Sequence, residues 1–264
     1  MARIDRDDIR AKVVRLLEGA ADAQVFDAGL HALLCSWGKE SDSAGAARFI
    51  PGMGESYGVS VPVLRLVAAE LAKWGRKHPD WAFALIERLW HHGSREERVV
   101  AAKMLERLGK AQWERTLETA SGFVGTIRNW EECDQLGCFG LRKVVQRHPE
   151  AVLPRCAEWV QDEDRWTRRL GVVVLTSLPK GKGYLPTGDE FAVLDQVMAD
   201  GAREVQDAVA WALREIGDDH PAAVADYLRR HAPGAGRSTR RIIKQAMKVL
   251  PEDDRQALLR LLEQ

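Results

Sequence analysis

Trp130 and Asp134 stand four residues apart in the segment Asn129-Trp130-Glu131-Glu132-Cys133-Asp134-Gln135. On a helix this spacing places both side chains on one face, so a carboxylate would lie beside an indole ring. Such a pair can stabilise a bound cation or a transition state that gains positive charge. The alternative interpretation is a core tryptophan near an exposed aspartate, and the spacing by itself favours that alternative.

Arg169 and Trp211 occur in two later helical segments. Asp162-Glu163-Asp164 opens the first segment and suits a helix N-terminus, and Arg169 follows one turn in, where it could reach into a cleft. A surface ion pair with one of those acids is the alternative for Arg169. Alanines surround Trp211, so it could instead belong to the core.

Other site chemistries find little support in the sequence. There is no CxxC pair, no His-x3-His motif and no cluster of carboxylates and histidines, so we expect neither a metal site nor a cofactor. Gly181-Lys182-Gly183 and Gly234-Ala235-Gly236 lack the strand-loop-helix context of a phosphate loop. A hydrolase that uses Cys133 or Cys138 stays open as a third interpretation, although no nucleophile elbow is present.

Composition indicates a globular, cytoplasmic protein. Of the 264 residues 45% are hydrophobic, no apolar run reaches the length of a membrane span, and the N-terminus lacks a signal peptide's apolar stretch. We expect no membrane partner and one domain over residues 1–264.

The net charge is zero, yet one segment has seven basic residues and no acid: Arg229, Arg230, Arg237, Arg240, Arg241, Lys244 and Lys248. It could follow DNA phosphates or be a solvated helix face.

Helical periodicity runs through the chain. Pro62 precedes an apolar stripe that ends at Trp74, Ser94 and Glu97 form a capping-box pattern, and Trp166–Leu175 continues a helix despite its valines. Further apolar stripes mark helices through Trp81-Leu85-Leu89 and Ala208-Trp211-Ala212. No segment alternates as a strand should. We expect two long loops, over residues 38–58 and 179–189.

A His-Pro pair recurs at His78-Pro79, His148-Pro149 and His220-Pro221, at intervals of 70 and 72 residues. Half of that interval is about 35 residues, the period of two-helix repeats of the HEAT class. Each proline would begin a helix, with the histidine near the end of the helix before it. The sequence therefore predicts an all-α fold, a curved right-handed solenoid of HEAT-like antiparallel helix pairs.

In order and spacing, these segments together resemble the AlkD-type DNA alkylation-repair glycosylases, which are built from HEAT-like repeats. The resemblance covers residues 46–250, after N-terminal helices in residues 1–45. Its pieces are Tyr57-Gly58-Val59-Ser60-Val61-Pro62, Leu85-Ile86-Glu87-Arg88-Leu89-Trp90, Arg95-Glu96-Glu97, Asn129 to Asp134, Trp166-Thr167-Arg168-Arg169 and Gln206 to Glu215.

The resemblance implies roles for individual residues. Asp134, Trp130 and Trp211 would be catalytic, and Arg169 would hold a phosphate of double-stranded DNA. Phe49 stands where relatives can carry a tyrosine that shapes the cleft, and it lacks the hydroxyl. Further DNA contacts are expected from Arg168, Arg237, Arg240, Arg241 and Lys244.

The implied activity is that of a monofunctional DNA glycosylase without a cofactor or metal. It would excise N3- or N7-alkylated purines, including bulky adducts, without a base-flipping pocket. We expect a monomer that acts on nucleoid DNA. The alternative is a non-catalytic solenoid that binds DNA structures or a protein partner.

Overall fold

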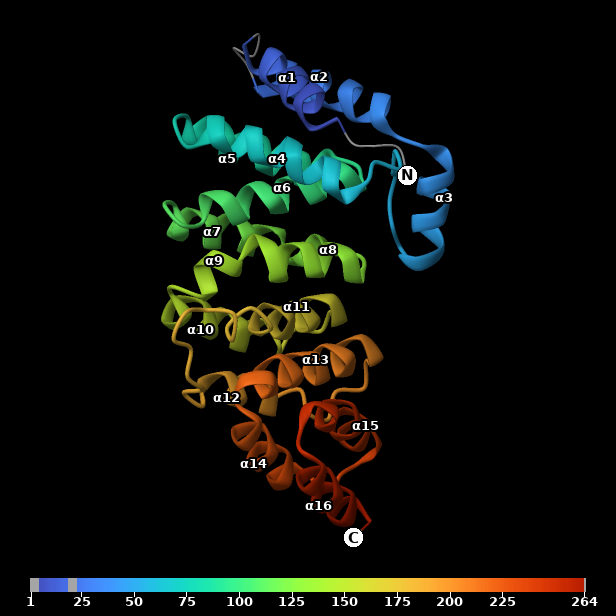
Figure 1. The fold of residues 1–264 in the computed structure, drawn as a ribbon, viewed down its shortest axis with the longest axis vertical. Coiled ribbons are helices and arrows are strands. Elements are labelled where there is room, and N and C mark those ends of the chain that lie inside the picture. The colour runs from blue at the N-terminus through green and yellow to red at the C-terminus, as the bar shows by residue number, and fades with distance from the viewer. Residues whose placement is uncertain (1–4, 19–22, 264) are drawn as a thin grey trace. The chain divides into compact units, whose positions relative to one another are not determined.

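The computed structural model of the protein describes residues 5–18 and 23–263. Every regular element in those ranges is a helix, so the predicted all-α fold is confirmed (Figure 1). None of the helices described there is both long and apolar enough to cross a membrane. The chain forms two compact units, Met1–Lys143 and Val144–Gln264. A single domain over residues 1–264 stays a prediction.

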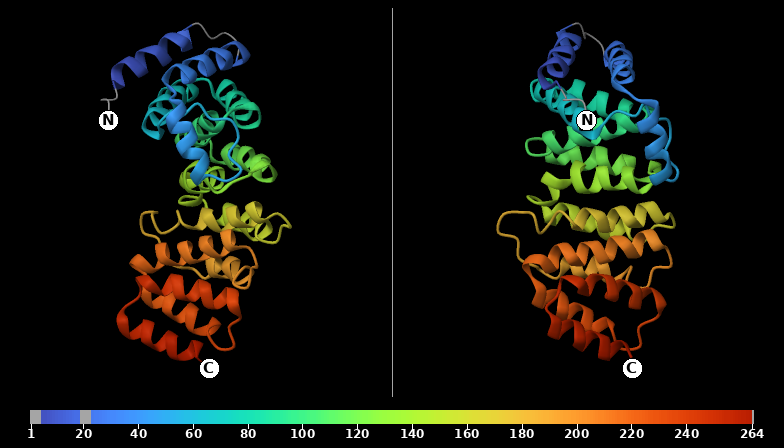
Figure 2. Two further views of the ribbon diagram at one scale, coloured as in Figure 1. Left: turned by 90° about the vertical axis from the view of Figure 1, so that its right-hand side faces the viewer. Right: turned by 45° about the vertical axis from the view of Figure 1, so that its right-hand side comes forward.

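The first unit consists of helices that pack in two rows. α1, α4 and α6 pack in succession, and α2, α5 and α7 form a second row. Figure 2 shows the same order from two other sides. The bounds are α1 (Arg6–Glu18), α2 (Ala23–Trp37), α3 (Glu40–Phe49), α4 (Val61–Gly75), α5 (Pro79–His92), α6 (Arg95–Leu108), α7 (Trp113–Phe123), η1 (Val124–Thr126), α8 (Trp130–Asp134) and η2 (Gln135–Gly140). A short helix, α9 (Arg142–Val145), lies at the boundary between the units.

The second unit repeats this plan. α11, α13 and α15 pack in succession, while α10 packs against α11 and α12, and α14 against α13 and α16. The bounds are α10 (Pro149–Trp159), α11 (Arg165–Leu175), α12 (Asp189–Asp195), α13 (Arg203–Asp219), α14 (Pro221–His231), α15 (Arg237–Ala246), η3 (Met247–Val249) and α16 (Glu252–Leu262). Stacked helix pairs of this kind are the arrangement of HEAT-like repeats.

Local sequence signals explain where these helices begin. The three His-Pro pairs each start a helix, at α5, α10 and α14, because proline fits the first turn, where its missing N–H costs no hydrogen bond. Ser94 and Glu97 form the expected capping box at the start of α6. The buried faces of α4 and α5 carry the predicted apolar stripes, with Leu64, Leu85 and Leu89 inaccessible to solvent.

The loop expected over residues 38–58 is wrong in its first half, because Glu40–Phe49 forms α3. None of its residues is buried, so apolar periodicity could not reveal it. Acids in its first turn and Arg48 in its last complement the helix dipole. Ser43 Oγ also donates a hydrogen bond of 2.9 Å to the Ser56 carbonyl, which ties α3 to the loop that follows. The second expected loop lies between α11 and α12.

Candidate functional site

The pair Trp130 and Asp134 forms the first and last residues of α8, a helix of only five residues. Asn129 caps it, since its Oδ1 accepts a hydrogen bond of 3.0 Å from the Glu132 N–H. Asp134 keeps helical angles, with φ −69° and ψ −36°. The four-residue spacing therefore acts as it does on a regular helix, and both side chains share one face.

Trp130 lies beside Phe49, a residue 81 positions earlier in the chain. The indole Nε1 donates a hydrogen bond of 2.9 Å to the Phe49 carbonyl oxygen at the end of α3. Both side chains remain accessible, with Phe49 76% and Trp130 38% exposed. Trp130 is therefore not a buried core residue, and a hydrogen bond joins its ring to the backbone of a second predicted site residue, Phe49, in the first unit. Asp134 is half-buried.

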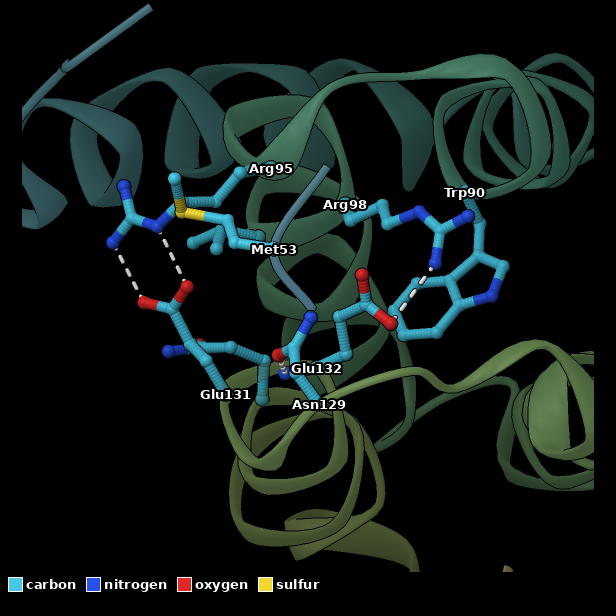
Figure 3. Close-up of a pocket in the computed structure, with 9 residues that line it drawn as sticks. Met53, Trp90, Arg95, Arg98, Asn129, Glu131 and Glu132 are labelled. Carbon is cyan, nitrogen blue, oxygen red and sulfur yellow. Dashed lines mark hydrogen bonds and ion pairs between the residues drawn. The ribbon is translucent and has the colours of Figure 1, made fainter. Parts of the chain in front are cut away.

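Two acids of α8 pair with two arginines of α6 (Figure 3). Arg95 holds Glu131 by two hydrogen bonds, Nε to Oε2 and Nη2 to Oε1, each of 2.6 Å. Arg98 Nη1 lies 3.1 Å from Oε2 of Glu132. Burial alone would lower the pKa of Arg95, but Glu131 and Glu96 more than offset this and raise it. All four paired side chains are nearly buried, so Glu131 and Glu132 face the protein interior.

A small pocket lies between these ion pairs, and Met53, Trp90 and Asn129 also line it (Figure 3). Its open space is about 10 Å³, which is hardly enough for one water molecule. The surrounding side chains leave no room for a ligand. The ion pairs around this pocket hold α8 against α6.

The chain passes directly from Asp134 into η2, a π-helical turn. Turns of this kind are rare and often occur at functional sites. Lys103 of α6 packs against it, with Nζ 2.8 Å from the centroid of the Phe139 ring. In the described part of the chain Nζ has no hydrogen-bond partner, and burial lowers its pKa to about 7. Lys103 could not be recognised from the sequence, because nothing in the local pattern marks a lysine at a buried position.

Arg169 and Arg168 lie on α11 in the second unit. Arg169 is 7% exposed, so it is not a solvated surface side chain, and its Nη1 donates a hydrogen bond of 2.8 Å to the Glu204 carbonyl. Arg168 instead pairs with Asp200, Nε to Oδ2 at 2.7 Å. The guanidinium of Arg169 is thus fixed by the start of α13, against which α11 packs.

Trp211 of α13 is half-buried beside an open pocket of about 330 Å³, which Arg214, Asp218 and Lys248 also line. The indole Nε1 donates a hydrogen bond of 2.7 Å to Oε1 of Glu215. Glu215 Oε2 in turn lies 3.0 Å from Nζ of Lys180. Trp211 therefore has a ring held by a hydrogen bond, and it lines an open pocket instead of being fully buried in the core.

The basic segment divides into two kinds of side chain. Arg240 donates hydrogen bonds to the carbonyls of Ala235, at 2.7 Å, and Leu262. Arg241 pairs with Asp207, at 2.6 Å. Arg237 and Lys244, by contrast, are exposed. The segment is neither wholly a solvated face nor wholly available to a partner.

The predicted site residues fall into two groups, one in each unit. Trp130, Asp134 and Phe49 belong to the first unit, while Trp211, the arginines of α11 and the basic segment belong to the second. Within the described ranges, no group of three or more His, Cys, Asp or Glu residues could hold a metal ion. The thiols of Cys133 and Cys138 are buried, which gives no support to a cysteine nucleophile.

Comparison with known proteins places the chain in a family. A family model described as DNA alkylation repair enzyme matches residues 30–250. A predicted DNA alkylation repair enzyme from Enterococcus faecalis has a similar fold, with a TM-score of 0.68, 16% identity, and 81% of this chain and 97% of that chain covered. The Pseudomonas fluorescens alkylpurine DNA glycosylase AlkC, bound to DNA containing an abasic site analog, gives a TM-score of 0.49 at 15% identity, with 92% of this chain and 61% of that chain covered. No curated protein sequence matches the chain. Since the family model spans most of its length, the chain belongs to the DNA alkylation repair enzyme family.

Proposed function

We propose that the protein is a monofunctional DNA glycosylase that hydrolyses the N-glycosidic bond of N3- or N7-alkylated purines in duplex DNA. One observation carries this proposal. In a chain of the alkylation repair family, an exposed indole and a carboxylate share one face of α8. We further propose that it acts as a monomer on nucleoid DNA in the cytoplasm.

The proposed chemistry follows from the charge of the lesion. Alkylation at N3 or N7 leaves the purine positively charged, so the base departs with the electron pair of the broken bond and needs no strong acid. The deoxyribose gains oxocarbenium character as the base leaves. A fixed carboxylate stabilises this cation electrostatically, and that is the role of Asp134. Asp134 also orients a water molecule, whose oxygen bonds to the sugar carbon while its proton passes to the carboxylate.

The aromatic side chains act on the same developing charge. The face of an indole is negative, so Trp130 stabilises a cationic sugar placed against it. By the resemblance to the alkylation-repair glycosylases, Trp211 would supply a second aromatic surface, and Phe49 would add to the surface around Trp130. Their hydrogen bonds to fixed partners, the Phe49 carbonyl and Glu215, keep both indoles oriented before DNA binds.

Arg169 would hold a phosphate beside the lesion, since guanidinium groups bind phosphate with charge-assisted hydrogen bonds. The lesion would stay in the base stack. A reaction outside an enclosed pocket would also accept bulky adducts.

The test is single-turnover release of 3-methyladenine or 7-methylguanine from alkylated duplex DNA. We expect Asp134→Asn to bind the duplex with nearly normal affinity and to lose excision by about 100-fold or more. Asp80→Asn, an exposed acid of the same unit, is the matched control and should excise normally. Undiminished release by Asp134→Asn would refute the catalytic role of Asp134. DNA binding with no release by the wild-type protein would favour the non-catalytic solenoid.

A further inference from the structure

The helical segment made by α8 and η2 runs only from Trp130 to Gly140, which is too short to hold its own conformation in water. Isolated helices need about 12 to 15 residues to be even marginally stable, because nucleation is costly. α8 carries both Trp130 and Asp134 and passes directly into a π-helical turn. Something outside α8 must therefore fix its orientation.

We propose that Arg95 and Arg98 are positioning residues for α8, which they clamp through Glu131 and Glu132 so that Trp130 and Asp134 keep a productive orientation. The function assigned to α8 rests on the proposed glycosylase activity, but the clamp itself is a feature of the fold. Trp130 and Asp134 are four residues apart, and the two clamped acids lie between them in sequence. The anchoring and the chemistry thus use different faces of one short helix.

The geometry of Arg95 suits this role. Its guanidinium donates two parallel hydrogen bonds, both of 2.6 Å, to the Glu131 carboxylate. Two such bonds fix the orientation of the carboxylate as well as its distance. Its own backbone N–H donates a hydrogen bond of 2.8 Å to the Glu55 carbonyl, in the segment between α3 and α4. Its Nη1 lies 3.2 Å from Glu96. Arg95 thus joins α6, that segment and α8.

Arg98 acts one turn further along α6. Its Nη1 reaches Glu132, 3.1 Å away, and the Thr126 carbonyl, 3.4 Å away. Its guanidinium also lies 5.5 Å from the centre of the buried Trp90 ring, which limits its movement. Glu132 accepts a second hydrogen bond, of 2.8 Å, from the Arg128 N–H. The chain before α8 is therefore held together with α8 itself.

Two measurements on the full chain test the clamp. The first is amide hydrogen exchange of residues 130–135, in which Arg95→Met and Glu131→Gln should exchange about 10-fold to 100-fold faster than the wild type. Glu131→Gln leaves the contact between Arg95 and Glu96 in place, so it remains informative if Arg95→Met folds poorly. Asp27→Asn, which breaks the similar pair with Arg88 between α2 and α5, is the matched control and should leave this exchange unchanged. Unchanged exchange in both clamp variants overturns the proposal.

The second measurement is excision at saturating protein. Displacement of a catalytic group by about 1 Å can cost about 100-fold, so Arg95→Met should slow release by roughly 10-fold to 100-fold while the Kd for duplex changes by less than about 3-fold. Combined with Asp134→Asn, it should cause no further loss, because the clamp acts through that carboxylate. A multiplicative loss in the double variant, or a normal rate in both single clamp variants, overturns the positioning role. Absence of release by the wild type refutes the glycosylase assignment instead, and hydrogen exchange alone then decides the clamp.

Discussion

Replacing Lys103 with methionine should raise the free energy of unfolding of the first unit by an amount that depends on pH. The Lys103 ammonium is 2% exposed, faces the Phe139 ring and has no hydrogen-bond partner in the described structure. Burial lowers its pKa from 10.5 to about 7; Arg65 and Arg142 act in the same direction, and Glu106 opposes them. Methionine has a similar length, carries no charge and makes favourable contacts with aromatic rings.

The sign and size of the effect follow from the two pKa values. Between about pH 7 and 10.5 the unfolded chain binds more protons at Lys103 than the folded chain, so the free energy of unfolding rises with pH. The cost of burying the charge is therefore complete below about pH 7 and fades toward pH 10.5. From about pH 6.5 to pH 9 this contributes about 2.5 kcal/mol, or roughly 1 kcal/mol if the folded pKa lies one unit higher.

The assay is urea unfolding of the wild type and Lys103→Met over this pH range, followed by tryptophan fluorescence and circular dichroism. The Lys103→Met variant should be more stable than the wild type near pH 6.5, and its advantage should shrink by about 1 to 3 kcal/mol by pH 9. Comparison with the variant cancels the titration of all other groups. A stability difference that does not change with pH would show that Lys103 finds a partner for its charge and would refute the reasoning.

Two further predictions concern binding and stability. Glu96 is fully buried and accepts hydrogen bonds from the backbone N–H groups of residues 57–59. Glu96→Gln should therefore lower the free energy of unfolding by about 2 to 4 kcal/mol in urea titrations. A loss under about 0.5 kcal/mol would contradict this. Arg240→Ala and Arg241→Ala should weaken binding to all duplexes alike and flatten the salt dependence of that binding. Both variants should also have a lower melting temperature, because each arginine makes hydrogen bonds or ion pairs within the protein. Arg237→Ala and Lys244→Ala should weaken binding and flatten its salt dependence without lowering the melting temperature, because both side chains are exposed. Unchanged DNA affinity in both pairs of variants would leave the segment without a role in binding.

The sequence alone determined the helices and the chemistry that a single helix can hold. Proline at a helix start, the Ser94 capping box and the apolar stripes act between residues a few positions apart, so they could be recognised without a fold. The pairing of Trp130 with Asp134 is of the same kind, since four residues span about one turn. The helix α3 escaped this reasoning because it buries none of its residues and so leaves no apolar period.

Only the tertiary structure decided which distant residues serve α8. Phe49 meets Trp130 across 81 positions, Arg95 meets Glu131 across 36, and Lys103 meets a ring on the π-helical turn after Asp134. The same holds for Arg240 and Arg241, whose charges looked available in sequence and are partly used inside the second unit. The physical reason is that a side chain's partner depends on which helices stack together and in what register. Contacts between stacked helices set that register, and the periodicity within each helix does not.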